Sequence, residues 1–258
     1  MRAVFSLLTA HLRIERGPML IATLAVCLAR GVFPSVHFVT DFLGAEISDR
    51  LGWHFDSVDK SLEYIPATPA WAAGKLHAYA AQTEAFLHLD FDVLLLRTEI
   101  YPSLHRPIIV QSEDFADLYT GREAMRIRNA LSLPPATPYN CGVFGGTDIQ
   151  AIHEYATQAI ALLDSLPPDA NGTLASVMVE QFHLGAFSER ECAPVSTLLP
   201  MCASHADCEP VGYCHLWGGA KRDKRWIARA ETRLARDFPE AYRRFLRGWP
   251  ALTSAALA

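Results

Sequence analysis

Residues 86–96 read FLHLDFDVLLL, an apolar run that two carboxylates, Asp90 and Asp92, interrupt. In an extended strand, positions i and i+2 point to the same face, about 6.6 Å apart along the chain. Two carboxylates on one face repel each other by about 3 kcal/mol at about 5 Å and an effective dielectric of about 20. A bound cation offsets this repulsion, and oxygen ligands suit Mg²⁺ or Mn²⁺. The stretch therefore predicts a metal site at a strand end, with turn or capping hydrogen bonds as the alternative.

A second signal lies about 125 residues further along the chain, where residues 215–221 read HLWGGAK. The imidazole of His215 can complete a metal site as a neutral ligand. Gly218 and Gly219 let backbone N–H groups approach phosphate oxygens, and Lys221 can neutralise those oxygens. A histidine beside a glycine pair is by itself more often structural. Its pairing with an upstream Asp-x-Asp element favours one metal site that both segments share.

Strands and helices alternate along the rest of the chain. The apolar runs predict strands at 3–8, 36–40, 53–58, 86–96, 108–111 and 139–144. The helical periods predict helices at 19–30, 47–51, 71–81, 147–166, 174–187 and 226–246, with an irregular region at 188–212. This alternation predicts an α/β fold with a mixed, mostly parallel sheet that helices flank.

The charge of the chain is unevenly distributed. The 258 residues carry a net charge of −5, yet residues 221–247 hold ten Lys or Arg and four Asp or Glu. This segment therefore carries +6 and the remainder −11, and an acidic body argues against nucleic-acid binding. We interpret 224–247 as an amphipathic helix with a solvated basic face. The alternative is peripheral contact of this segment with anionic lipid.

Six cysteines are present, and four of them fall between residues 192 and 214 without a CxxC pair. The spacing of Cys192, Cys202, Cys208 and Cys214 matches no common zinc-binding pattern, so we interpret them as free thiols in a reducing cytoplasm. The apolar stretch at 19–29 is too short to span a bilayer, which needs about 20 residues. We expect a cytoplasmic location, with peripheral placement at the inner face of the membrane as an option.

Two polar residues follow the first two predicted strands. Thr9 and Asp41 stand where these strands end. In open α/β sheets, ligands lie beyond the carboxyl ends of the strands, so both residues are candidates for binding a nucleotide. Asp41 would hydrogen-bond a ribose or a base, and the alternative is that it caps the next helix.

At the level of motifs, Asp90-x-Asp92 followed by His215-x-x-Gly218-x-x-Lys221 resembles the metal and diphosphate set of glycosyltransferase family eight and related GT-A enzymes. This resemblance implies Asp90, Asp92 and His215 as metal ligands. It also implies that Asp90, Gly218, Gly219 and Lys221 contact the donor.

Three further segments between these motifs match the same family. Residues 139–144, with Asn140 and Gly142, resemble its Phe-Asn-Ala-Gly-Val strand, which faces the donor sugar. Lys75 resembles the basic residue that touches the donor. Glu180 and Gln181 resemble the acidic or amide pair that faces the reacting sugar. The resemblance therefore implies Asn140, Glu180 and Gln181 as the catalytic set.

The resemblance implies a GT-A-like domain over residues 1–221 and a basic helical extension over 222–258. It implies a hexosyltransferase that uses Mn²⁺ or Mg²⁺ and moves a sugar from a nucleotide-sugar, such as a UDP-sugar, to a carbohydrate or glycolipid acceptor. The chain departs from the family at 222–223, where Arg-Asp replaces Pro-Trp, and at His88, where the family has Tyr. These departures indicate a sister group.

Two other classes fit parts of the sequence. Haloacid-dehalogenase-like phosphatases also place Asp-x-Asp after an apolar strand, but Thr or Val normally follows two places on, where this chain has Leu94. Their motif also lies near the start of the core, whereas some 85 residues precede it here. A non-catalytic nucleotide-sugar-binding protein on the same fold is the other alternative.

Overall fold

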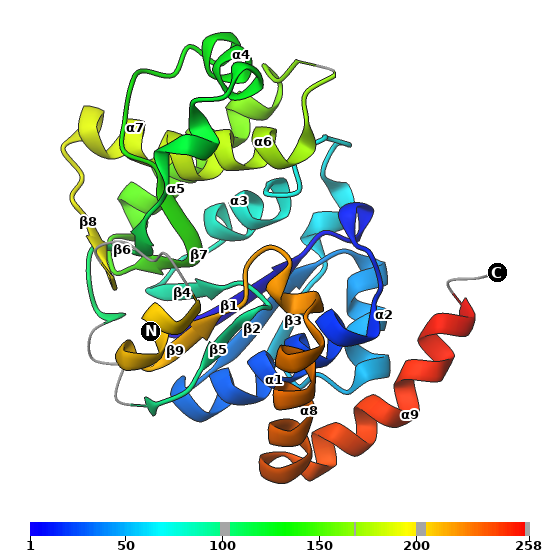
Figure 1. Cartoon of the computed structure of the whole chain (residues 1–258). Helices are drawn as coiled ribbons and strands as arrows, with labels where there is room; N and C mark the ends of the chain where they lie inside the picture. Colours follow the sequence, from blue (N-terminus) through cyan, green and yellow to red (C-terminus); the bar gives the residue numbers. More distant parts are fainter. Residues whose placement is uncertain (99–103, 168, 200–204, 256–258) are drawn as a thin grey trace. The chain divides into compact units, whose positions relative to one another are not determined.

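The computed structural model describes residues 1–98, 104–167, 169–199 and 205–255. The chain divides into two compact units (Figure 1). The terminal unit, which contains both ends of the described chain from Arg2 onward, comprises Arg2–Glu63, Leu89–Tyr101 and Ser204–Ala258. The central unit comprises Tyr64–His88 and Pro102–Ala203, together with Met1.

The terminal unit is built on three parallel strands in the order β3-β2-β1, namely β1 (Arg2–Leu7), β2 (Val36–Thr40) and β3 (Ser57–Asp59). The register pairs Ala3 with Val36 and Leu7 with Thr40. A separate antiparallel pair consists of β5 (Val93–Leu95) and β9 (Tyr213–His215). The third strand begins later than the predicted 53–58.

Four α-helices accompany these strands in the described part of the terminal unit, α1 (Arg16–Val32), α2 (Phe42–Leu51), α8 (Lys224–Asp237) and α9 (Pro239–Ala255). Helix α1 packs against α8, and α2 packs against α9. Helix α2 begins five residues before the predicted 47–51, because the Asp41 carboxylate caps it by accepting a hydrogen bond from Gly44 N at 2.7 Å.

The single basic helix predicted at 226–246 is wrong. Helices α8 and α9, coloured orange and red in Figure 1, are separated at Phe238, whose φ of −134° and ψ of 57° are not helical. The residue before a proline is disfavoured in the helical region, and Pro239 follows. Proline is nevertheless well tolerated at the first position of the next helix. Among the described residues, no helix combines the length and the hydropathy that a membrane span requires.

The central unit contains strands in the order β4-β7-β6-β8, namely β4 (Phe86–Leu89), β7 (Tyr139–Gly146), β6 (Ile108–Glu113) and β8 (Val195–Thr197). Strand β6 pairs antiparallel with β7 and parallel with β8. Each unit is thus an α/β layer structure, and the predicted mostly parallel sheet with flanking helices is confirmed. The region 188–212 was expected to be irregular, but it contains the end of the helix His183–Glu191, strand β8 and the 3₁₀-helix His205–Val211, so that expectation is wrong for these residues.

The helices of the central unit include α3 (Ala73–Ala80), α4 (Arg122–Ala130), α5 (Ile149–Leu163), α6 (Gly172–Val177) and α7 (His183–Glu191). Helix α3 packs on α5. The range predicted as a helix, 174–187, is helical throughout, but a π-helical turn at Met178–Phe182 that was not predicted joins α6 to α7. Helix α4 was not predicted.

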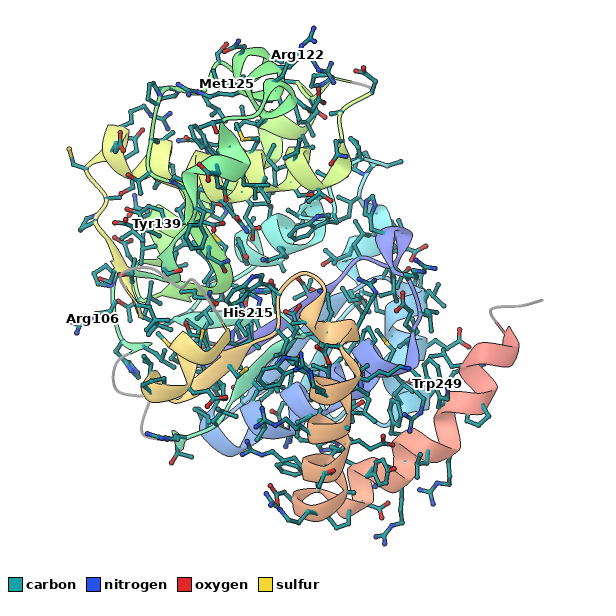
Figure 2. The ribbon with its side chains drawn as sticks, viewed as in Figure 1. Arg106, Arg122, Met125, Tyr139, His215 and Trp249 are labelled. Carbon is teal, nitrogen blue, oxygen red and sulfur yellow. The ribbon has the colours of Figure 1, made fainter. Side chains whose placement is uncertain are left out.

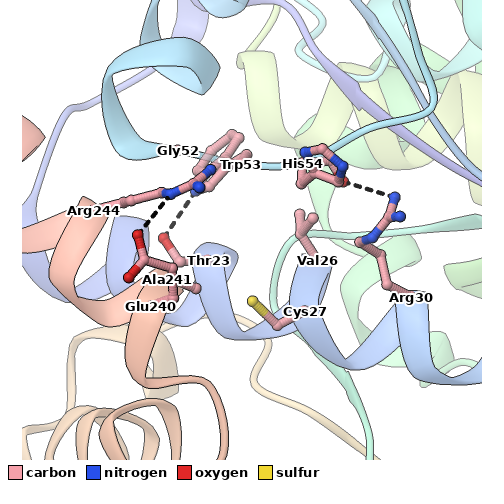
Figure 3. A pocket seen from close by; sticks show the side chains of 10 residues that line it. All are labelled: Thr23, Val26, Cys27, Arg30, Gly52, Trp53, His54, Glu240, Ala241 and Arg244. Carbon is pink, nitrogen blue, oxygen red and sulfur yellow. Dashed lines mark hydrogen bonds and ion pairs between the residues drawn. The ribbon is translucent and has the colours of Figure 1, made fainter.

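A cavity of about 260 Å³ lies in the terminal unit (Figure 3). Its lining comes from α1, α9 and the segment 52–54, and it includes Cys27. Burial raises the pKa of the Cys27 thiol to about 11, so the thiol is protonated at neutral pH. At its rim, Arg30 donates to His54 O and Arg244 donates to Glu240. These two cations thus serve contacts within the protein.

The described cysteines, Cys27, Cys141, Cys192, Cys208 and Cys214, are free thiols, as predicted. Cys202, which the zinc interpretation also needed, lies outside the described residues.

A buried histidine predicts how the stability of the protein depends on pH. His183 is 3 % exposed, its ring stacks on Tyr155 at 5.7 Å, and neither ring nitrogen has a hydrogen-bond partner in the described chain. Burial, with a contribution from Arg190, lowers its pKa to about 4 from 6.5. Below pH 6.5 the unfolded chain therefore binds a proton that the folded chain does not. The free energy of unfolding should fall by about 2 kcal/mol from this group between pH 7 and pH 5.

Urea unfolding at both pH values measures this loss, and His183→Phe is the matched variant because it keeps an aromatic ring against Tyr155. Between pH 7 and pH 5, the free energy of unfolding of the variant should fall by about 2 kcal/mol less than that of the wild type. Burial also depresses the pKa of His88 strongly, so part of the dependence should persist in the variant. Identical pH dependence in the two proteins would show that His183 is not the group responsible.

Candidate metal and diphosphate site

Asp90 and Asp92 lie in a turn rather than in one continuous strand. Strand β4 ends at Leu89 and β5 begins at Val93, with a hydrogen bond of 2.9 Å from Val93 N to Asp90 O. The predicted unbroken strand at 86–96 is therefore wrong, and so is the placement of both carboxylates on one strand face. A turn brings them together by a different route.

Phe91, between the two aspartates, anchors this turn in the terminal unit. Its ring lies 4.9 Å from the ring of Phe5 and stacks on Trp53 at 4.9 Å, and it meets Phe38 edge-on at 5.8 Å. Aromatic contacts of this kind stabilise by about 0.5–1.5 kcal/mol each beyond the area they bury. The anchored ring thus limits where the two flanking carboxylates can lie.

His215 reaches the aspartates through strand pairing. Strand β9 runs antiparallel to β5 with His215 opposite Val93, and Leu216 N donates to Asp92 O at 2.9 Å. His215, labelled in Figure 2, places its Nε2 3.3 Å from Asp92 Oδ1. The predicted convergence of two segments distant in sequence is confirmed.

One ligand atom from each of Asp90, Asp92 and His215 can be chosen so that all three lie within 4.8 Å of one another. Across the described part of the chain, this is the one group of three or more His, Cys, Asp or Glu side chains with metal-binding geometry. The donor set is two carboxylates and one imidazole, which divalent cations such as Mn²⁺ accept. The site is therefore chemically suited to a metal ion.

Lys221 completes the charge pattern, with its Nζ 2.7 Å from Asp92 Oδ2. The Asp92 side chain is 9 % exposed, and burial alone would raise its pKa. The charge of Lys221 and the hydrogen bond from His215 outweigh burial, so the pKa of Asp92 lies well below its usual range. Asp92 is therefore ionised at neutral pH, which a metal ligand requires. For Lys221, burial lowers the pKa, but Asp92 more than offsets it and raises that pKa.

The glycine pair of this segment leaves space beside the polar group. Gly218 has a φ of +61°, in the left-handed region that favours glycine. A Cβ added at Gly218 or at Gly219 would meet no atom within 4 Å. Trp217 lies edge-on to the ring of His215 at 5.3 Å. The backbone here is thus open enough for a ligand to approach.

Thr9 and Asp41, the other candidates in the terminal unit, contact each other. Asp41 Oδ2 accepts hydrogen bonds from Thr9 N at 2.7 Å and from Thr9 Oγ1 at 2.6 Å, and Oδ1 accepts the capping bond from Gly44. The carboxylate therefore ties the end of β1 to the start of α2, which corresponds to the capping alternative. Nucleotide binding by Thr9 and Asp41 stays a prediction.

In the central unit, Lys75 and Glu180 form a buried ion pair of 2.8 Å, with side chains 7 % and 0 % exposed. Lys75 also donates to Cys141 O at 3.0 Å, and Tyr79 donates to Glu180 Oε1 at 2.8 Å. Tyr155 donates to the backbone carbonyl of Glu180 at 2.8 Å. The structure thus brings together two of the residues that the resemblance singles out, and it joins them to each other.

Gln181 contacts Tyr119, which in turn contacts Asp114, and the sequence indicated neither of these two residues. Tyr119 Oη lies 2.6 Å from Gln181 Oε1 and 2.7 Å from Asp114 Oδ2. Burial, with Asp114 adding to it, raises the pKa of Tyr119, so the phenol stays neutral. A phenol has one proton, so both contacts are satisfied when Tyr119 donates to Asp114 and the Gln181 amide is turned over so that its NH₂ group donates to Tyr119.

The remaining candidates lie on β7, where Asn140 Oδ1 accepts from Gly142 N at 3.0 Å. Asn140 pairs with Ser112 next to a register shift between β6 and β7. Glu180 and Gln181 lie in the π-helical turn, a rare feature that often marks functional sites. Contact of these residues with a sugar stays a prediction.

The fold and the site together define an α/β protein with a cluster of two carboxylates, an imidazole and an ammonium group. The model of a family of unknown function, DUF6734, matches residues 19–247, and the chain belongs to this family. No curated protein matches the sequence.

Solved structures with a related arrangement have little sequence in common with this chain. One is the galactosyltransferase LgtC in complex with donor and acceptor sugar analogues, at 12% identity over 89% of this chain and 96% of that chain, with a TM-score of 0.45. An active-site mutant of LgtC is 12% identical over 90% of this chain and 95% of that chain, with a TM-score of 0.46. Apo mouse xyloside xylosyltransferase 1 is 10% identical over 76% of this chain and 84% of that chain, with a TM-score of 0.41. Any assignment of function therefore has to rest on the chemistry of this chain's own residues.

Proposed function

We propose that this protein is a metal-dependent glycosyltransferase with a GT-A-like fold, of the hexosyltransferase type. It would move a sugar from a nucleotide-sugar, such as a UDP-sugar, to a carbohydrate or glycolipid acceptor. The observation that carries the proposal is the convergence of Asp90, Asp92 and His215 within 4.8 Å. These are the residues to which the Asp-x-Asp and His-x-x-Gly-x-x-Lys motifs point.

Mn²⁺ or Mg²⁺ would be held by Asp90, Asp92 and His215. The ionised Asp92 and the mixed oxygen and nitrogen donors support this assignment, because hard divalent cations take carboxylates and Mn²⁺ also accepts imidazole. Three protein ligands leave coordination positions for the oxygens of a diphosphate. When bound, the ion would neutralise the diphosphate as it leaves the sugar.

The other residues of the terminal unit would bind the donor. Lys221 would neutralise non-bridging oxygens, and the open backbone at Gly218 and Gly219 would accept a close approach of the phosphates. Thr9 and Asp41 would contact the nucleotide. These roles concern the binding and stabilisation of charge that develops on the leaving group.

In the central unit, Asn140, Glu180 and Gln181 would orient the donor sugar and the acceptor, with Lys75 and Gly142 contacting the donor. The support is the fixed geometry of the π-helical turn, in which Tyr79 holds Glu180 and Tyr119 holds Gln181. Rigid support of polar groups is what substrate positioning needs.

Calorimetry of UDP binding with and without Mn²⁺ tests the proposal most directly. We expect Mn²⁺ to tighten UDP binding by roughly 5- to 150-fold, the usual range of coupling between two ligands. EDTA should reverse the effect, and a donor supplied with Mn²⁺ should be turned over. Equal UDP affinity with Mn²⁺ and with EDTA would show that the ion does not bridge the diphosphate. Metal-dependent binding without turnover of any donor would instead indicate a nucleotide-sugar-binding protein.

We keep a catalytic domain over 1–221 and a basic extension over 222–258, in a cytoplasmic protein, as part of the proposal. Peripheral contact of 224–247 with the inner face of the membrane is a subsidiary proposal. Its support is exposed arginine, with the side chains of Arg225 and Arg247 87% and 72% exposed, although both lie in ion pairs with acidic neighbours. Co-sedimentation with anionic vesicles, absent with neutral ones, tests it.

A further inference from the structure

The carboxylate of Asp92 serves two partners at once. Its Oδ2 lies 2.7 Å from Lys221 Nζ, and its Oδ1 lies 3.3 Å from His215 Nε2. The Lys221 side chain is 36% exposed, whereas that of Asp92 is only 9% exposed. The ammonium therefore occupies the more open side of the metal-binding group, on an oxygen that a cation could also use.

We propose that Lys221 competes with the cation for Asp92. The Lys221 ammonium pairs with Asp92 in the absence of an ion and turns to the anionic ligand once an ion binds. The inference rests on the proposed function, because the ion belongs to it. It adds a coupling between the two ligands: the cation displaces the ammonium, and the displaced ammonium then favours a diphosphate.

Charge balance requires this exchange. Asp90, Asp92 and Lys221 together carry one net negative charge, and a divalent ion changes it to one net positive charge. An ion and an ammonium on the same carboxylate would repel each other strongly in a buried setting. A diphosphate supplies the missing negative charge and gives the ammonium a new partner. Cation and diphosphate should therefore bind with positive cooperativity that depends on Lys221.

The local backbone lets the side chain move while the segment stays in place. Next to Lys221, Arg222 forms an ion pair with Glu15 at 2.9 Å, and Asp223 caps α8 by accepting from Arg225 N at 2.8 Å. These contacts hold the residues that follow Lys221. The space beside Gly219 is open, so the flexible lysine stem has room to reach a ligand there.

Mn²⁺ binding without nucleotide tests the inference, measured by the loss of the electron paramagnetic resonance signal of free Mn²⁺. Lys221→Met keeps the length of the stem and removes the charge. We expect Lys221→Met to bind Mn²⁺ at least about fivefold more tightly than the wild type, and UDP to add less to Mn²⁺ affinity in the variant than in the wild type. Lys224→Met is the matched control, because it removes one positive charge from an exposed side chain three residues further on and leaves both Asp92 and the Arg222–Glu15 ion pair in place.

The outcomes separate this inference from the proposed function. Equal or weaker Mn²⁺ binding in Lys221→Met, or an equal gain in Lys224→Met, would overturn the competition and leave the metal site intact. If neither the wild type nor Lys221→Met bound Mn²⁺, the proposed function itself would fail along with the inference. Circular dichroism melts confirm that each variant is folded, and Lys221→Gln provides a second uncharged variant.

Discussion

Asp92→Asn is expected to reduce metal-dependent donor turnover by about a thousandfold or more, because a metal ion supplies several kcal/mol of charge stabilisation in the transition state. Asp92 contacts both His215 and Lys221, so its loss removes a metal ligand and the partner of the ammonium together. The asparagine keeps the volume of the side chain. Lys221 is partly exposed and can reach solvent, so we expect the variant to fold.

The measurement is donor turnover at saturating Mn²⁺, together with Mn²⁺ binding by paramagnetic resonance. Asp164→Asn is the matched control, since Asp164 is an exposed aspartate at the end of α5, far along the sequence from either motif. The control should keep wild-type turnover and binding. Wild-type turnover in Asp92→Asn would mean that Asp92 holds no catalytic ion.

The parts of the fold that were predicted from sequence are those whose signal is local. Strand β2 has the predicted bounds, because an apolar run at 36–40 is followed at once by a helix-capping aspartate. Helix α1 extends the predicted 19–30 by three residues before it and two after it, since the ends of a helix depend on contacts outside it. The positions of such elements follow directly from the spacing of apolar residues along the sequence.

The parts that were missed depend on partners distant in sequence. Strand β8 has three residues, and it is a strand because it pairs with β6. No local sequence pattern predicts this pairing. The π-helical turn at Met178–Phe182 has an apolar spacing close to that of an α-helix, so periodicity does not distinguish the two. The break at Phe238, in contrast, could have been predicted from the sequence, because Pro239 disfavours a helical conformation of the residue before it.

The candidate site shows the same division. Asp90, Asp92, His215 and Lys221 could be found because their motifs combine unusual residue types at fixed spacing. The turn that places the aspartates depends on the pairing of β5 with β9, which could not be predicted from either segment alone. Tyr119 and Asp114 were missed because a tyrosine five residues after an aspartate is common, and the pair gains meaning only through the contact of Tyr119 with Gln181.

Glu180→Gln is expected to lower the stability of the protein by about 3–5 kcal/mol, the usual cost of leaving one member of a buried ion pair without its partner. The amide can still accept the hydrogen bond of Tyr79, but it no longer neutralises Lys75, which is 6% exposed. Cys141 O and the face of Trp71 remain as partners of the ammonium and favour the lower end of the range. The melting temperature should fall by about 6–20 °C, which a calorimetric melt measures.

A double-mutant cycle shows whether the charge pair is the cause. Lys75→Met alone should also destabilise the protein, because it leaves the Glu180 carboxylate buried without a cation, whereas the double variant with Glu180→Gln carries no buried charge at this position. We expect the double variant to be more stable than the sum of the two single losses implies, by at least about 1 kcal/mol. Glu154→Gln, an exposed glutamate on α5, should change stability by no more than about 0.5 kcal/mol. Strictly additive losses would show that each side chain stabilises the protein through other contacts and that the charge pair itself contributes no coupling.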